Sequence, residues 1–111
     1  MTKVNVAVEF VVAEVAEFDA EVERVSEQFF ELAENADFAS DPSLVSDSSK
    51  RLVVLTCYGE GQTVYLATAN ALAVVLKAVE TAAVAQWHWQ ATHVTPADAA
   101  RTNSKNELLS A

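Results

Sequence analysis

Apolar and polar positions alternate along Lys3–Ala13, the most regular stretch of the chain. Side chains of an extended strand point alternately to its two faces, so this spacing separates two sets of residues. One set is large and apolar throughout: Val4, Val6, Val8, Phe10 and Val12. The other set mixes small and polar side chains with Val11. The pattern predicts a central strand with at least one buried face.

The next pattern, over Glu14–Asn35, has the period of a helix. Its apolar residues recur at intervals of four, three, four and three: Phe18, Val22, Val25, Phe29 and Leu32. Acidic residues recur on its outer surface: Glu23, Glu27, Glu31 and Glu34. Neighbouring like charges cost about 0.2–0.5 kcal/mol each, whereas burial of each large apolar side chain contributes about 1.5–3 kcal/mol. We therefore predict a helix that is held by its apolar stripe and has a solvated acidic surface.

Two different signals follow this helix. Residues 36–50 are rich in Ser, Asp and Pro, which predicts a loop with a short edge strand at Ser43–Ser46. Arg51–Tyr58 then predicts a strand in which both alternating sets are apolar. One set comprises Leu52, Val54 and Tyr58, and the other comprises Val53, Leu55 and Cys57. A strand covered on one face only would alternate, so both faces of this strand are expected to be covered.

Gly59-Glu60-Gly61 predicts the end of that strand, with both glycines free to take positive φ. The segment after it has two interpretations. A helix capped by Thr63 could run to Ala83, or Thr63–Thr68 could be a strand with Asn70 capping a shorter helix. The content of Ala, Leu and Lys favours the long helix.

The last alternating stretch is Gln86–Thr95, which predicts a strand with Trp87 and Trp89 on one face and His88 on the other. Pro96 ends this strand, because proline has no N–H to donate to a ladder.

The order of the predicted elements is strand, helix, weak strand, strand, helix, strand. This order predicts an α+β fold, a ferredoxin-like split β-α-β sandwich in which an antiparallel sheet carries two helices on one face. We expect a single domain over residues 1–95 and a polar tail over residues 96–111, forming a short helix or disordered.

The formal charge of −9 is unevenly distributed along the chain. Residues 1–47 hold twelve acidic and two basic residues, and residues 48–111 hold four acidic and five basic residues. The acidic half repels nucleic-acid phosphates and anionic membrane surfaces, so direct binding to nucleic acid or membrane is disfavoured. A basic protein partner is compatible with the same charge.

Composition and element order together suggest a resemblance. The chain has no isoleucine, few lysines and abundant valine and alanine. In these respects it resembles short, acidic, uncharacterised α+β proteins of actinobacteria and their phages. The resemblance implies the fold, leaves a bacterial or viral origin open, and implies no activity.

The sequence favours a cytoplasmic protein. Its first residues lack the apolar stretch of a signal peptide, and no window approaches the roughly 18 uninterrupted apolar residues that span a bilayer. Cys57 is the only cysteine, which excludes an internal disulfide.

No catalytic or metal-binding motif is recognisable, so we expect no catalytic residue, metal or cofactor. His88 and His93 are five residues apart in a predicted strand, which places them on opposite faces and prevents them from sharing an ion. Cys57 lies in an apolar strand, where a thiol is usually a small and inert hydrophobe. Trp87 and Trp89 are interpreted as core residues on either side of a solvent-facing His88.

The doubly apolar strand is the strongest functional signal. Two helices cover only one face of such a sheet, so the other face would expose Val11 with one apolar set of Arg51–Tyr58. Monomers seldom leave a large apolar patch open. We hypothesise a non-catalytic interaction or assembly module that forms a homodimer through the open sheet face. The candidate partner-binding residues are Val11, Leu52, Val54 and Tyr58 on the sheet, and Glu23, Glu27, Glu31 and Glu34 on the acidic helix.

Two alternatives from other classes remain. A cofactor-free enzyme or small-ligand binder would have a pocket between paired sheets containing Glu9, His88 and Tyr58, with Glu9 and His88 as acid and base. An acidic inhibitor would instead use its helix to occupy a basic surface of a host protein.

Overall fold

The computed structural model describes residues 1–13, 17–83 and 89–96 of the 111-residue chain. Four strands and two helices follow one another in these residues: β1 (Thr2–Val12), α1 (Phe18–Asn35), β2 (Ala39–Asp47), β3 (Leu52–Gly61), α2 (Val64–Ala82) and β4 (Trp89–Pro96).

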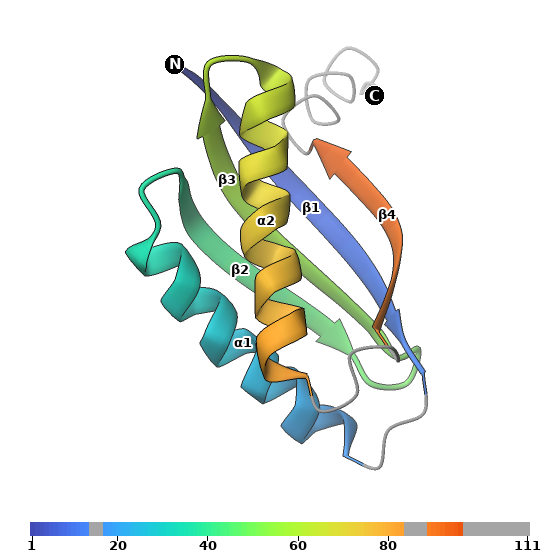
Figure 1. Ribbon diagram of the computed structural model, residues 1–111. Helices are drawn as coiled ribbons and strands as arrows, with labels where there is room; N and C mark the ends of the chain where they lie inside the picture. The colour runs from blue at the N-terminus through green and yellow to red at the C-terminus, as the bar shows by residue number, and fades with distance from the viewer. Residues whose placement is uncertain (14–16, 84–88, 97–111) are drawn as a thin grey trace.

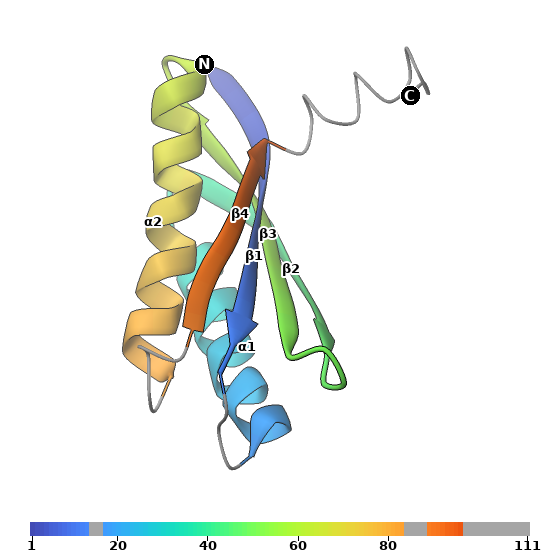
Figure 2. The ribbon, with the colours of Figure 1, turned by 90° about the vertical axis from the view of Figure 1, so that its right-hand side faces the viewer.

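The strands form one antiparallel sheet in the order β2-β3-β1-β4. Both helices pack on the same face of this sheet, as Figures 1 and 2 show. The predicted α+β class is therefore confirmed. The prediction that the first strand is central is also confirmed: β1 pairs with β4 on one side and with β3 on the other, continuously from Thr2 opposite Gly61 to Val11 opposite Leu52.

The core lies between the sheet and the helices. The large apolar set of β1 is buried there, together with one set of β3: Val53, Leu55 and Cys57. The helix α1 contributes its predicted stripe, of which Val22, Val25 and Phe29 are buried. The second apolar set of β3 therefore points to the face opposite α1 and α2.

The edge strand β2 is longer than the predicted Ser43–Ser46, because hydrogen bonds to β3 order residues whose composition is typical of a loop. Its pairing with β3 is interrupted between Ser40 and Ser43 by a register shift. Asp41 within this irregularity has a φ of 54°, a backbone conformation that residues other than glycine seldom adopt.

The prediction that Gly59 and Gly61 end the strand with positive φ is wrong. β3 runs to Gly61, and neither glycine has a positive φ. Glycine is required here because α2 crosses close above the strand: a Cβ on Gly59 would overlap the carbonyl oxygen of Ala67 and lie 2.8 Å from the Ala71 nitrogen. The two glycines thus set the distance between α2 and the sheet.

The long-helix interpretation of the segment after Gly61 is correct. Thr63 caps α2, because its Oγ1 accepts a hydrogen bond from the Leu66 N–H at 3.1 Å. The alternative strand at Thr63–Thr68 is excluded, since the helix begins at Val64. At the other helix, Glu17 occupies the cap position of α1 without a side-chain hydrogen bond.

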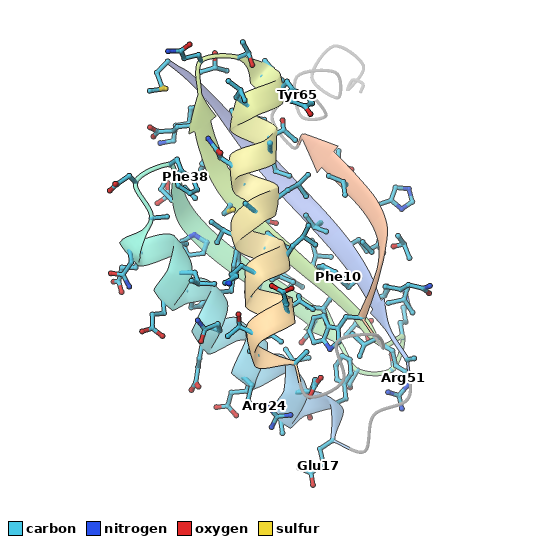
Figure 3. All side chains as sticks on the ribbon, in the orientation of Figure 1. Phe10, Glu17, Arg24, Phe38, Arg51 and Tyr65 are labelled. Carbon is cyan, nitrogen blue, oxygen red and sulfur yellow. The ribbon has the colours of Figure 1, made fainter. Side chains whose placement is uncertain are left out.

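The strand β4 is anchored to α1 by a buried carboxylate. Glu21 is only 2 % exposed, and its Oε2 accepts a hydrogen bond from Nε1 of Trp89 at 3.1 Å. Its Oε1 accepts a 2.6 Å hydrogen bond from Arg24, which Figure 3 labels on α1. The Trp89 ring also meets the edge of Phe10 at a centroid distance of 5.6 Å. The core interpretation is therefore confirmed for Trp89, whereas Trp87 and His88 lie outside the described residues.

Candidate interaction surface

The sheet face opposite the helices carries a contiguous row of apolar side chains. Val45 of β2 pairs with Val54 of β3, and Leu52 of β3 pairs with Val11 of β1. Paired residues of antiparallel strands point to the same face, so these four side chains lie on adjacent positions across three strands. We call them the apolar row. No described helix or strand covers this face in Figure 2.

The apolar row is accessible to varying degrees. Val45 is 68 % and Val11 38 % exposed, whereas Leu52 and Val54 are partly shielded by their neighbours. All of these residues except Val45 are among the partner-binding residues predicted from the sequence. Val45 lies within the predicted edge strand Ser43–Ser46, but the surrounding Ser, Asp and Pro give no apolar alternation that would assign it to this face.

Tyr58 lies on the same face but away from the apolar row. Its register partner on β1 is Asn5, and its ring lies 4.8 Å from the Nζ of Lys3. This arrangement forms a cation–π contact rather than an extension of the apolar row. Of the partner-binding residues predicted on the sheet, Val11, Leu52 and Val54 therefore lie together. Tyr58 lies at the opposite end of the same face.

The structure pairs Glu9 with His93. Oε1 of Glu9 lies 3.5 Å from Nδ1 of His93, on the open face. The predicted partner, His88, lies outside the described residues. Glu9 and Tyr58 are separated by four positions in the register of β1 and β3, about 13 Å at roughly 3.3 Å per residue. Within one protomer, the structure therefore offers the enzyme alternative a Glu–His pair, with Tyr58 four register positions away from Glu9.

A bulge in β4 explains the new partner. Phe10 pairs with Ala91 and Glu9 pairs with His93, so Thr92 is the extra residue. The bulge turns His93 to the face that Glu9 occupies. The parity argument against a shared histidine site assumed a regular strand, and this assumption is wrong beyond Ala91. No group of three or more His, Cys, Asp or Glu side chains that could hold a metal ion occurs within residues 1–13, 17–83 and 89–96.

The predicted acidic residues lie on the helix-bearing side. Glu23, Glu27, Glu31 and Glu34 are all exposed on α1. Three of them line an open groove of about 680 Å³ between the C-terminal half of α1 and the start of β2. The groove has an apolar floor that includes Phe30, Ala33 and Pro42, and its acidic rim consists of Glu27, Glu31, Glu34 and Asp41. We refer to it as the acidic groove.

Cys57 is fully buried beneath α2, where its Sγ lies 3.8 Å from the carbonyl oxygen of Ala71. Burial raises the pKa of its thiol to about 11 from an ordinary value of 9.0. The thiol is therefore protonated and shielded at neutral pH, as expected for a structural cysteine rather than a nucleophile.

We expect native Cys57 to resist alkylation by iodoacetamide at about pH 8 and to react within minutes once urea unfolds the chain. Between pH 9.0 and about 11, the folded state retains the thiol proton whereas the unfolded state loses it. The contribution of the protonated Cys57 thiol to stability is therefore complete below pH 9.0 and is lost as the pH rises towards 11. Mass spectrometry of the alkylated protein tests the accessibility, and rapid modification without urea would contradict the buried position.

Among the described residues, α2 is the one helix long and apolar enough to cross a membrane, by length and composition only. This is weak evidence, because a helix from a protein core passes the same test. The apolar side of α2, which includes Ala67, Ala71 and Val75, is buried in the core of this structure.

Comparison with known proteins gives no relative: no family model, no curated protein and no solved structure matches the chain.

Proposed function

We propose that this chain is a non-catalytic interaction module that forms a symmetric homodimer by stacking its open sheet face on that of a second copy. The observation that carries the proposal is the apolar row, which crosses three strands on the face that neither described helix covers. Apolar side chains at adjacent positions give the strongest reason to remove a surface from water.

The distribution of charge favours a second copy as the occupant. A chain with a net charge of −9 repels its own kind, so self-association is favoured when most of the acidic residues lie away from the contact. The exposed acids of α1 lie on the helix-bearing side of the sheet. Stacking of the open faces would leave these carboxylates on the outer surfaces of the dimer, in water.

The size of the face indicates a weak dimer. Its four strands, about 4.8 Å apart and about nine residues long, present roughly 600 Å² per protomer. The pair would bury roughly 1,200 Å², at the lower limit of specific interfaces. We therefore expect a dissociation constant on the order of 10 μM, since a small and partly polar face contributes little beyond the entropy lost on association.

The proposal includes the ferredoxin-like split β-α-β class. It is supported by the order β2-β3-β1-β4 and by the position of both helices on one face. A cytoplasmic location is a further part of the proposal, since a reduced and buried Cys57 suits a compartment in which thiols are not oxidised.

Sedimentation velocity over a concentration series tests the dimer. Val45→Glu should raise the dissociation constant at least about tenfold, because it places a carboxylate in the stacked faces. Val64→Glu is the matched control, because Val64 is a similarly exposed valine at the start of α2, on the other side of the sheet. A wild-type protein that stays monomeric at about 0.5 mM, or equal weakening by both variants, would refute the proposal.

A further inference from the structure

The acidic groove is a second surface, which self-association through the sheet does not use. It lies where α1 ends and the chain turns into β2, and Figure 3 labels Phe38 at this turn. Its floor offers an aromatic side chain, Phe30, that is 43 % exposed. The groove therefore combines an apolar contact with a rim of one charge sign.

The rim carboxylates form no ion pair within 4 Å in the part of the chain that the structure describes. The ion pairs formed there join Arg24 to Glu21 and His93 to Glu9, and neither reaches the groove. A group on the groove wall also lacks a partner: the Oγ of Ser40 is buried and makes no hydrogen bond to another described residue. Buried polar atoms are normally hydrogen-bonded, so an unpartnered hydroxyl at this wall is unusual.

We propose that the acidic groove binds an extended, arginine-bearing segment of a partner protein. A guanidinium group can stack on the exposed ring of Phe30 while it donates paired hydrogen bonds to a rim carboxylate. Opposite charges give such a segment a rapid approach, because the acidic half of the chain provides a long-range field.

The spacing of the rim favours arginine over a compact cation. Glu27, Glu31 and Glu34 follow one another at intervals of four and three residues on α1, so they form a line about one helical turn apart. A line of carboxylates suits a chain that presents a charge at every second residue, about 6.6 Å apart when extended. Arginine also loses less hydration than lysine when it is partly buried against an aromatic ring.

Binding of a fluorescein-labelled peptide of alternating arginine and alanine tests this proposal by fluorescence anisotropy. The double variant Glu27→Gln, Glu31→Gln should weaken binding at least about tenfold at about 0.15 M salt, because two charge-assisted contacts are removed. The matched control is Glu23→Gln, Glu80→Gln, which changes the net charge equally at exposed helix positions outside the groove. The control should change the affinity less than about threefold, an effect of net charge alone.

Further variants address the floor and the identity of the cation. Phe30→Ala should weaken the peptide several-fold without loss of the fold, since Phe30 is partly exposed. A peptide of alternating lysine and alanine should bind less tightly than the arginine peptide. Equal losses in the groove and control variants would show general attraction to an acidic protein and would overturn the proposal. No effect of Phe30→Ala, or equal binding of both peptides, would overturn it as well.

Discussion

Replacement of Glu21 by alanine is expected to lower the free energy of unfolding by about 3 kcal/mol. The reason is the buried network at the start of β4. Glu21 accepts hydrogen bonds from Trp89 and Arg24, and its removal leaves the indole N–H of Trp89 without this acceptor in a buried place. Loss of the acceptor costs more than the bond itself, because the donor gave up its hydration on folding.

Urea unfolding followed by tryptophan fluorescence measures this loss. Glu23→Ala on the same helix is the control, and it should change stability by less than about 0.5 kcal/mol because Glu23 is exposed. A double-mutant cycle with Trp89→Phe should give a coupling energy of about 1–2 kcal/mol between the two side chains. Additive effects of the two substitutions would contradict a direct contribution of the Glu21–Trp89 hydrogen bond to stability.

Gly59→Ala is expected to destabilise the protein by about 3 kcal/mol, at the upper end for overpacked cores. The added Cβ would meet the backbone of α2 at the carbonyl of Ala67 and the nitrogen of Ala71. Backbone cannot rotate aside as a flexible side chain can, so the whole helix would have to move away from β3. Such a movement would loosen the core contacts around Val75 and Cys57.

Thermal unfolding and amide chemical shifts of α2 test this expectation. Glu60→Ala lies between the two glycines but points to the opposite face, so it should cost less than about 1 kcal/mol. Shifts in Gly59→Ala should extend along α2, whereas those of Glu60→Ala should remain local. A Gly59→Ala protein as stable as the wild type would show that α2 does not approach the strand so closely.

The fold was largely predictable because apolar periodicity determines it. The alternation in Lys3–Ala13 and the stripe from Phe18 to Leu32 each identify an element and its buried side. Their agreement with the structure reflects the dominance of apolar burial over local preference. The long helix after Gly61 was also predictable, since Thr63 supplies a cap and the following residues are good helix formers.

Features that depend on pairs of elements were not predictable. The need for glycine at position 59 arises from the path of α2, which no local pattern specifies. The Glu9–His93 pair depends on a bulge at Thr92, and the buried state of Glu21 depends on the position of β4. In the sequence, Glu21 is one acid among many on an acidic helix, and its burial against Trp89 distinguishes it in the structure.

The irregular β2 strand also restricts how copies of this chain can assemble. β2 is the outer strand of the sheet, and Pro42 there has no N–H to offer an incoming strand. The left-handed backbone conformation at Asp41 bends this edge of the sheet away from a regular strand geometry. Growth by lateral strand addition is therefore blocked on this side. Concentrated protein should accumulate as discrete pairs rather than polymerise into fibres.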